Sequence, residues 1–368
     1  MAGYLIGESR MSLNWNTITG PQVLVDSRKS KRNIKRMQEK AESAGVDLRP
    51  HFKTHQSVTI GKWFGKPAET AIAVSSATMA RTFADAGWND ILMAIPLNPR
   101  ALPAYNRLAR EVQLGLTIEN ADSLKTIARL LSPVDVYVEI DAGYGRTGIS
   151  WREHESINLI LEQARKMPQV RSLGLLLHAG NSYTMRGEHG IAQIHQESLQ
   201  RLAELIENLS IPRSELRVSV GDTPTCSRME SFPGADEIRP GNYVFYDWQQ
   251  QRIGACDWPD VALAVACPVI GIYPERNEVV VHGGAVHFSK DSVTIDGKQI
   301  FGQVMHQTTN GWGSPIQGAQ LVGVSQEHGK VRVPEGMLKE LELGDLLIIV
   351  PAHSCLVMAA FNGECTVI

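Results

Sequence analysis

Residues 112–141 read VQLGLTIENADSLKTIARLLSPVDVYVEID. This stretch predicts a strand over 112–119, a helix over 120–131 that opens on an Asn or Asp cap, and a second strand over 134–141. Both strand segments are near-continuous apolar runs, which is typical of parallel strands that are buried on both faces. The stretch therefore indicates a β–α–β unit of a parallel α/β protein.

The same alternation of strand and helix extends from this unit in both directions along the chain. Strand and helix alternate about eight times between residues 20 and 248, starting with a strand at 22–26 (QVLVD) and a helix that ends near Gly45. About eight such units favour a (β/α)8 TIM-type barrel over an open sheet. We expect this barrel to occupy residues 18–260.

The alternation of strand and helix stops after residue 260. The later sequence is rich in strand-like runs with glycine turns and has few helical segments, which predicts a mostly antiparallel β domain over residues 261–368. Residues 1–17 are not clearly part of either domain. Whether they pack on the second domain is left open.

Composition limits the classes of function. The net charge of −3 leaves no electrostatic footprint for nucleic acid, and the one dense basic run, RKSKRNIKR at 28–36, predicts a solvated helix face. The five cysteines are odd in number and widely spaced, so no disulfide framework is expected. There is no apolar run of 18 residues and no signal-like N-terminus, so we expect a cytoplasmic protein with no membrane partner.

Reactive groups in such barrels gather at the carboxyl ends of the strands. Polar loops that follow apolar runs lie at 49–56 (RPHFKTHQ), 141–148 (DAGYGRTG), 178–187 (HAGNSYTMRG), 221–225 (GDTPT) and 237–247 (EIRPGNYVFYD). Gly221 with Thr223, and Gly241 with Asn242, offer backbone N–H groups and a hydroxyl in the late loops where barrels build phosphate sites. Each loop alone is more often a simple turn, but together they predict an anion site.

Lys53 lies between His51 and His55, just past the end of a predicted strand. A lysine in that place, with phosphate loops elsewhere, suggests pyridoxal 5′-phosphate (PLP), because the amine forms an imine with the cofactor aldehyde and the ring stabilises a carbanion at Cα. Arg49 and the two histidines would lower the pKa of the amine and favour the imine. For any lysine taken in isolation, a solvated surface cation is the alternative.

The motifs in combination resemble the D-serine dehydratase and D-threonine aldolase group of fold-type III PLP enzymes, which are related to alanine racemase through the barrel. The resemblance runs from about residue 18 to about residue 361, over PQVLVD, RPHFKTHQ, DAGYGRTGI, HAGNSY, GDTPT, EIRPGNYVFYD and a late HSC. It implies that Lys53 is the Schiff-base lysine and the base that takes the α proton. It also implies that Arg146 matches the arginine that alanine racemases place near the cofactor phenolate.

The resemblance implies further cofactor contacts. Gly241 and Asn242 match the phosphate-binding stretch, and Thr223 is a further phosphate contact. Tyr183 falls where the family brings a tyrosine near the pyridine ring. Arg239 aligns with the alanine racemase arginine that faces the ring nitrogen. Which of these two side chains takes that part is left open.

The late motif PAHSC, at 351–355, suggests a metal site. In a strand, His353 and Cys355 would point to the same face, and imidazole with thiolate suits zinc. Two ligands alone are a weak signal. The resemblance strengthens it, because this group uses His-x-Cys or His-x-Asp to hold a divalent metal beside the cofactor. Zinc is expected, with Mn, Co and Mg as alternatives.

Cys355 also bears on the reaction, because dehydratases of this group tend to carry cysteine there and aldolases aspartate. The resemblance therefore favours a PLP-dependent lyase that eliminates water from a D-3-hydroxy amino acid, giving a 2-oxo acid and ammonia. A D-threonine or D-3-hydroxyaspartate aldolase that cleaves Cα–Cβ is the alternative. An amino-acid racemase and a non-catalytic PLP-binding protein are less favoured, and the choice among D-3-hydroxy amino acids is open.

The resemblance implies a homodimer in which the β domain of one subunit faces the barrel mouth of the other. In that arrangement His306 and Gln303 would line the active site of the partner subunit. His282 and His287, which flank the turn in HGGAVHFSKD, are expected to be structural, with a substrate-side role as the alternative.

Overall fold

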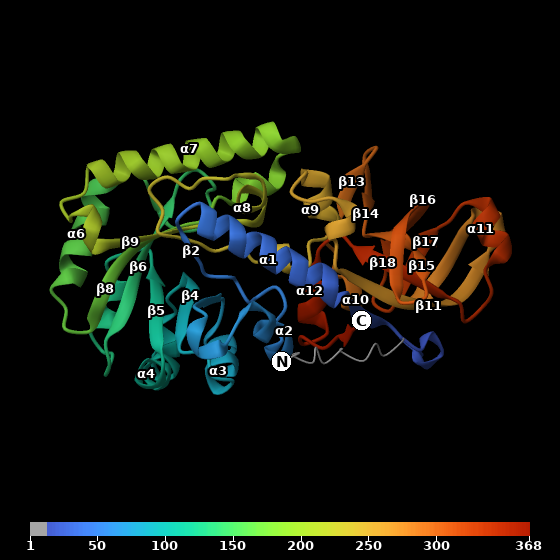
Figure 1. Ribbon diagram of the computed structural model, residues 1–368, viewed down its shortest axis with the longest axis horizontal. Coiled ribbons are helices and arrows are strands. Elements are labelled where there is room, and N and C mark those ends of the chain that lie inside the picture. The colour runs from blue at the N-terminus through green and yellow to red at the C-terminus, as the bar shows by residue number, and fades with distance from the viewer. Residues whose placement is uncertain (1–12) are drawn as a thin grey trace, which may run out of the picture. The chain divides into compact units, whose positions relative to one another are not determined.

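The computed structural model describes residues 13–368, which divide into two compact units (Figure 1). The barrel unit comprises residues 31–246 and 250–257, and the β unit comprises residues 13–30, 247–249 and 258–368. Among residues 13–368, no helix is long and apolar enough to cross a membrane. We describe each unit separately.

The barrel unit is built around eight parallel strands that neighbour one another in the order β2, β10, β9, β8, β6, β5, β4 and β3. They are β2 (Asp47–Leu48), β3 (Ile72–Val74), β4 (Asp90–Pro96), β5 (Gln113–Ile118), β6 (Val134–Asp141), β8 (Val170–Leu177), β9 (Leu216–Val220) and β10 (Glu237–Ile238), with the short β7 (Ile149–Ser150) paired to the end of β6. In β5 and β6 nearly every residue is buried, as their continuous apolar runs predict.

Two backbone hydrogen bonds join the two ends of this strand order. Phe52 N donates to Ala73 O at 2.8 Å, and Ala73 N donates to Pro50 O at 3.0 Å. This parallel bridge links the chain just after β2 to β3 and closes the ring. The predicted (β/α)8 barrel is therefore confirmed, and Lys53 is the residue directly after the closing bond.

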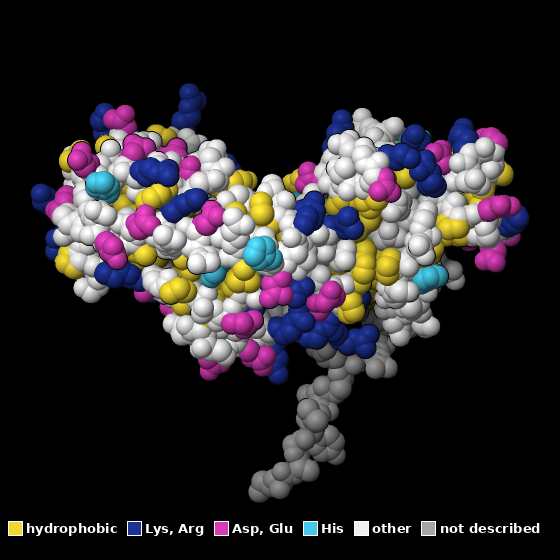
Figure 2. Space-filling view, turned by 90° about the horizontal axis from the view of Figure 1, so that it is seen from above, with side chains coloured by type: hydrophobic (Ala, Val, Ile, Leu, Met, Phe, Trp, Pro, Cys, Tyr) yellow, Lys and Arg dark blue, Asp and Glu magenta, His cyan; other side chains and the backbone are white. Residues whose placement is uncertain are grey.

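Helices lie outside the barrel strands (Figure 1). They are α1 (Ser27–Ser43), α2 (Val58–Gly61), α3 (Ala77–Asp85), α4 (Leu102–Glu111), α5 (Ser123–Ile127), α6 (His154–Arg165), α7 (Gly187–Glu207), α8 (Thr223–Arg228) and α9 (Trp248–Ile253). In α1 the basic side chains at 31, 32, 35 and 36 are exposed while Ile34 and Met37 are buried, so the predicted solvated helix face is confirmed. Figure 2 shows acidic and basic side chains interspersed on the face that it draws.

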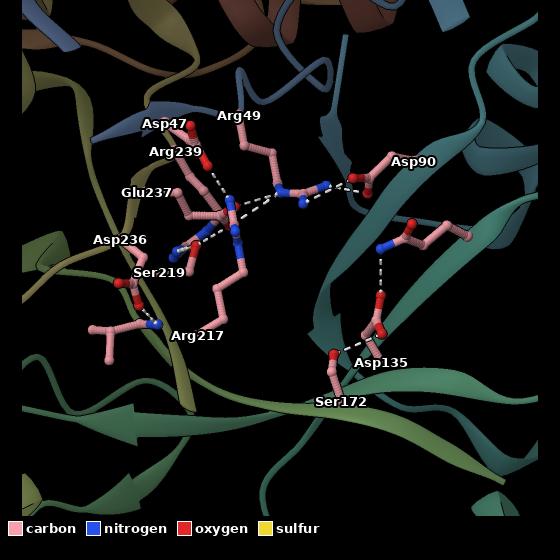
Figure 3. Close-up of polar contacts among 12 residues, drawn as sticks. Asp47, Arg49, Asp90, Asp135, Ser172, Arg217, Ser219, Asp236, Glu237 and Arg239 are labelled. Atoms are coloured by element: carbon pink, nitrogen blue, oxygen red, sulfur yellow. Dashed lines mark hydrogen bonds and ion pairs between the residues drawn. The ribbon is translucent and has the colours of Figure 1, made fainter. Parts of the chain in front are cut away.

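A network of ion pairs occupies the amino ends of the barrel strands (Figure 3). Glu237, at the start of β10, accepts two hydrogen bonds of 3.0 Å from Arg49 Nε and one of 2.9 Å from Arg217 Nε. Arg49 also reaches Asp90 at 2.7 Å, and Arg217 reaches Asp47 at 2.5 Å. These side chains line a cavity of about 520 Å³. Each of the two arginines thus joins Glu237 to a carboxylate on another strand.

The β unit contains a sheet in the order β12, β17, β16, β15, β18, β11, β1 and β19, antiparallel except for the last pair. The bounds are β1 (Gln22–Val25), β11 (Leu263–Tyr273), β12 (Glu278–His282), β15 (Gly302–Thr308), β16 (Gly311–Val324), β17 (His328–Arg332), β18 (Leu346–Pro351) and β19 (Thr366–Val367). A separate hairpin, β13 (Val293–Ile295) and β14 (Lys298–Ile300), and the helices α10 (Ala285–Phe288), α11 (Glu335–Glu340) and α12 (Ser354–Ala360) complete the unit.

The first predicted strand lies in the other sheet from the one expected. Residues 22–25 do form a strand, but β1 pairs antiparallel with β11, with Leu24 opposite Ala264. The prediction that this segment begins the barrel is wrong, and β2 is the first barrel strand. An apolar run indicates that a strand is buried, but it does not indicate which strands pair with it.

The segments at 13–30 and 247–249 also group with the β unit, although the predicted barrel spans 18–260. Within residues 13–17, Trp15 Nε1 donates to Thr309 O of the same unit at 3.3 Å. Residues 1–12 of the predicted N-terminal segment lie outside the described residues.

Candidate active site

Lys53 stands on a turn that a buried aromatic residue anchors. Phe52 is fully buried, and its ring centroid lies 5.1 Å from that of Phe64, 4.9 Å from Phe83 and 5.5 Å from Trp88. The next side chain, Lys53, is exposed. The aromatic residue beside the lysine therefore fixes the backbone, while the amine emerges at the carboxyl ends of the barrel strands.

The two histidines that flank Lys53 in the sequence have different surroundings. His55 is buried against Phe52 at 4.4 Å, its Nδ1 accepts a hydrogen bond from Ser57 N at 3.1 Å, and burial lowers its pKa to about 3. His51 is also buried, and its pKa falls well below the usual value because of burial and then the charges of Lys53 and Arg239. His55 is thus a neutral core side chain, whereas His51 lies within the electrostatic reach of the lysine.

Arg49 does not belong to this group. Its guanidinium bonds Glu237 and Asp90 in the network at the amino ends of the strands. The prediction that Arg49 tunes the lysine is not supported, because the Glu237 and Asp90 carboxylates hold its guanidinium at the amino ends of the strands, the opposite end from Lys53.

His178, which follows β8, joins the lysine's surroundings. Its Nδ1 lies 2.8 Å from Gly221 O, and because a carbonyl can only accept, Nδ1 carries the proton. Burial, and then the charges of Lys53, Arg146 and Arg239, lower the pKa of His178 to about 3 against the opposing hydrogen bond to Gly221. Three of the predicted site residues, from three separate loops, therefore converge on one neutral imidazole.

Arg239, which follows β10, is buried and bonds to neutral acceptors. Its Nη2 donates to Leu177 O at 2.9 Å, and its Nη1 donates to the hydroxyl of Ser219. That hydroxyl in turn donates to Glu237, so one serine links Arg239 to the network at the other end of the barrel (Figure 3). Burial lowers the pKa of Arg239 despite the nearby Glu237 carboxylate.

The predicted phosphate loops meet each other. Asn242 N donates to Thr223 Oγ1 at 3.0 Å, and Thr223 N donates to Tyr183 Oη at 3.2 Å. Asp222 caps α8 by accepting from Thr225 N at 2.8 Å, and Ser182 Oγ donates to the same carboxylate at 2.7 Å. The loops after β8, β9 and β10 are thus tied into one structure.

Two glycines permit the close approach of these loops. A Cβ at Gly241 would lie 2.9 Å from both His51 O and Thr54 Oγ1, so only glycine allows this loop to touch the lysine turn. Gly221 has φ +150°, and a Cβ there would lie 2.6 Å from Arg239 N. The late loops and the turn of Lys53 therefore pack directly against each other.

Arg146 is exposed, unlike the buried Thr223, Arg239 and Asn242 among the predicted cofactor contacts. Its side chain is 48% exposed, lies 4.0 Å from Glu139 and covers the ring of Tyr144 at 5.2 Å. Its influence on the pKa values of His51 and His178 places it at the same end of the barrel as Lys53.

These donors suit PLP. A primary amine, a hydroxyl and glycine-bearing loops after the seventh and eighth barrel strands fit an aldehyde and a phosphate, and the two arginines fit further negative charge. The two glycines allow backbone to lie where any side chain would intrude.

The predicted metal pair, His353 and Cys355, lies at the start of a helix rather than in a strand. β18 ends at Pro351, His353 is the N-cap residue of α12, and Cys355 lies in its first turn. The expectation that strand geometry places both on one face is therefore wrong. The two side chains nevertheless meet, because the sulfur of Cys355 hydrogen-bonds the ring of His353. Burial lowers the pKa of His353. Cys355 and the Asp247 carboxylate outweigh burial and raise the pKa well above its usual value. Imidazole and sulfur in contact remain a donor pair that fits zinc.

A second group of metal-type side chains lies elsewhere in the β unit. His282, His287 and Glu327 each place one ligand atom within 4.8 Å of the others. His287 Nδ1 accepts from Gly284 N at 3.2 Å, so the neutral ring carries its proton on Nε2, which faces Glu327 at 3.9 Å. At 3.9 Å this contact is too long for a hydrogen bond, and the structural role expected for these histidines stays a prediction.

Two candidate residues were missed from the sequence. His178 opens HAGNSY directly after an apolar run, and this position at a strand end is the signal that marks it. Asp247 closes EIRPGNYVFYD, and no local pattern points from it to His353, because their contact joins distant parts of the chain.

Two family models match the chain. The model described as "Alanine racemase, N-terminal domain" matches residues 25–247, and the model described as "Putative serine dehydratase domain" matches residues 262–367. A D-threo-3-hydroxyaspartate dehydratase from Delftia sp. (strain HT23) is 32% identical over 94% of this chain and 93% of its own length. The chain belongs to the D-serine dehydratase and D-threonine aldolase family. Its fold is alanine racemase-like, and it is a PLP-dependent lyase.

Other members of the family cover nearly the whole chain as well. A D-serine dehydratase from Dictyostelium discoideum is 28% identical over 94% of this chain and 93% of its own length. A D-threonine aldolase from Arthrobacter sp. is 24% identical over 90% of this chain and 85% of its own length.

The solved structure of the Delftia dehydratase aligns with a TM-score of 0.84 at 30% identity, over 94% of both chains. Structures of that dehydratase also include a variant with a histidine replaced by alanine, and a variant with the cysteine two positions later replaced by alanine, in the metal-free form.

Proposed function

We propose that this chain catalyses the PLP- and divalent-metal-dependent elimination of water from a D-3-hydroxy amino acid, as a D-serine dehydratase does, giving a 2-oxo acid and ammonia. The observation that carries this proposal is the contact between His353 and the sulfur of Cys355, since cysteine at this place favours dehydration. The relatives at 32% and 28% identity are both dehydratases, which supports it.

Lys53 is the proposed catalytic residue. Its exposed amine holds the cofactor covalently and, once the substrate has displaced it, takes the α proton. Bound PLP supplies the electron sink for the resulting negative charge at Cα. Because His51 and His178 are buried and their pKa values are lowered, they stay neutral beside the lysine and leave proton transfer to it.

The other barrel residues hold and orient the cofactor. Thr223, Gly241 and Asn242 bind the phosphate, supported by the hydrogen bond between Thr223 and Asn242. Arg146 serves the phenolate side of the ring. Tyr183 and Arg239 both remain candidates for the ring nitrogen. The hydroxyl of Tyr183 accepts a hydrogen bond from Thr223 N, which ties it to the proposed phosphate loop.

His353 and Cys355 hold the divalent metal, and zinc is the metal that these donors suit best, with Mn, Co and Mg as alternatives. The spacing of the pair equals that of the histidine and cysteine replaced in two solved structures of a D-threo-3-hydroxyaspartate dehydratase, and the structure of the cysteine variant is of the metal-free form. A divalent metal held by these two residues would supply Lewis-acid chemistry at the β-hydroxyl of the substrate, which would make it a better leaving group. We propose that the barrel unit, which lies within the predicted range 18–260, binds PLP and that residues 261–368 carry the metal pair.

A D-threonine or D-3-hydroxyaspartate aldolase is the second candidate. The Arthrobacter relative is a D-threonine aldolase, and cleavage of Cα–Cβ would use the same lysine and the same metal pair. In that reaction the β-hydroxyl loses its proton instead of leaving as water.

A substrate screen tests the proposal. D-serine, D-threo-3-hydroxyaspartate and D-threonine would each be incubated with the enzyme before chelation, after chelation, and after zinc is restored, with ammonia, 2-oxo acids, glycine and aldehydes measured. We expect ammonia and a 2-oxo acid, lost on chelation and restored by zinc. Glycine with an aldehyde would establish the aldolase, and full activity after chelation would exclude the metal role.

Matched cysteine variants sharpen this test. Cys355→Ala is expected to lose bound metal and activity together, whereas Cys365→Ala, which removes another partly exposed thiol of the β unit, is expected to keep both. Equal metal content in both variants would contradict the assignment of Cys355 as a ligand.

We also propose a cytoplasmic homodimer. The cysteines at 226, 256 and 267 are buried free thiols, which suits a reducing compartment, and the dimer follows from the family resemblance. Light scattering coupled to gel filtration would give twice the chain mass, and a monomer with full activity would contradict the dimer.

A further inference from the structure

Asp247 is a fully buried carboxylate whose contacts lie beside the metal pair in the β unit. Its Oδ2 accepts hydrogen bonds from Ser354 N at 2.9 Å and from Ser354 Oγ at 3.2 Å. The same oxygen lies 3.3 Å from His353 Nδ1. One carboxylate oxygen therefore faces both His353 and the residue that follows it.

The contact joins two motifs that are far apart in the sequence. Ser354 lies 107 positions after Asp247. Asp247 ends the stretch whose Gly241 and Asn242 are proposed phosphate contacts, and His353 begins α12. The chain that leaves the phosphate loop thus supplies the acidic partner of the proposed metal histidine.

A carboxylate at Nδ1 decides what the other ring nitrogen does. When Nδ1–H donates to a carboxylate, the lone pair of the neutral imidazole is on Nε2, and the ring cannot rotate without losing that bond. The backbone N–H of Ser354 holds the carboxylate in place at the start of the helix. A hydrogen bond from Nδ1 to Asp247, which the 3.3 Å distance allows, would set both the orientation and the tautomer of the ring.

We propose that Asp247 is a positioning residue for the metal pair. Its carboxylate holds Nδ1–H of His353 and so presents Nε2 as the metal-binding nitrogen beside Cys355. This inference rests on the proposed function only in taking His353 as a metal ligand. It explains why a carboxylate with 0% exposure is retained next to an imidazole.

Asp247 also stabilises the start of α12 through Ser354, so a stability loss alone does not distinguish the two roles. The roles separate because the helix contact runs through Ser354 and the positioning contact runs through His353. Ser354→Ala removes a hydroxyl contact to the same carboxylate and leaves the imidazole in place, which makes it the matched control.

The test measures the zinc affinity of the PLP-loaded enzyme by competition with a chromophoric chelator. Asp247→Ala is expected to weaken zinc binding about 10–100-fold, the usual effect of losing such a partner. Asp247→Asn is expected to fall between it and the wild type, because the amide oxygen still accepts but carries no charge. Ser354→Ala is expected to bind zinc as the wild type does, and His353→Ala to lose more affinity than any of them.

A second measurement reports the positioning contact directly. In zinc-loaded enzyme labelled with ¹⁵N-histidine, His353 is expected to show a low-field Nδ1–H signal that moves upfield in Asp247→Asn. If Asp247→Ala does not fold, Asp247→Asn and this signal decide the question. Unchanged affinity and an unchanged signal would overturn the role of Asp247. If His353→Ala binds zinc as the wild type does, the metal pair of the proposed function fails instead.

Discussion

At the amino ends of the barrel strands Arg49 and Arg217 share the buried carboxylate of Glu237, whereas at the carboxyl ends Arg239 bonds a hydroxyl and a carbonyl. The first arrangement offsets buried charge with opposite charge, so it stabilises the barrel but has little left to offer a ligand (Figure 3). In the second, the hydrogen bonds of the Arg239 guanidinium go to neutral groups. Charge pairing, rather than the amount of charge, thus distinguishes these arginines at the two ends of the barrel, and we propose that ligand binding belongs to the carboxyl end.

The largest effect is expected at the carboxyl end. Lys53→Ala should abolish the visible absorbance of the covalently bound cofactor and lower activity by at least about 10³-fold, because both the anchor and the base are lost. Since Lys53 is exposed, the free energy of unfolding of the metal-free apoenzyme should change little. Absorbance spectra and urea unfolding check the two parts, and a variant that kept the absorbance band would sink the assignment.

The next effect is expected at the amino end. Glu237→Ala should lower the free energy of unfolding by about 3–5 kcal/mol, because it leaves Arg49 and Arg217 buried or half-buried without their shared carboxylate. Urea unfolding measures this loss. A variant as stable as the wild type, with lower activity, would mean that this network serves the reaction rather than the fold.

A pH effect is expected from His178. Its pKa is about 3 in the folded protein because of burial and the nearby charges, whereas an unfolded histidine titrates near 6.5, so the unfolded chain binds the proton first as pH falls. Its contribution to stability is full above about pH 6.5 and is lost as pH falls toward about 3, by about 2 kcal/mol between pH 7 and pH 5. His178→Asn should flatten that part of the stability profile. An identical profile in the variant would show that His178 is charged in the folded state.

The smallest effect is expected from the exposed member of the amino-end network. Asp47→Ala removes a carboxylate that pairs with Arg217. Because the Asp47 side chain is 71% exposed, the free energy of unfolding should fall by less than about 1 kcal/mol. It is the matched control for Glu237→Ala, because both variants remove a carboxylate from the same arginine. Equal losses in the two variants would contradict the view that burial decides the value of these pairs.

The local sequence was sufficient to predict much of the barrel and to select the proposed cofactor residues. Apolar runs between helical segments predicted the strands, and Lys53, Thr223 and Gly241 stand in loops directly after such runs. The structure brings them close to one another through the parallel order of the strands, which places all carboxyl ends at one edge.

Other features could not be read locally. QVLV has the composition of a buried strand in either sheet, and only its pairing with β11 placed it in the β unit. HSC was read as part of a strand, but the strand ends at Pro351 and the pair opens a helix. Arg49 was read as a neighbour of Lys53, but its side chain reaches the opposite end of the barrel.

The residue order of this chain determined which groups we propose for the chemistry. They are the amine of Lys53 at the end of a barrel strand, two glycine-bearing loops for the phosphate, and a histidine two positions before a cysteine. These signals are local, because strand ends, turns and short spacings depend on neighbouring residues. Only the tertiary structure decided which charges are paired and that Asp247 contacts His353, because burial and contacts between distant segments arise when the chain packs.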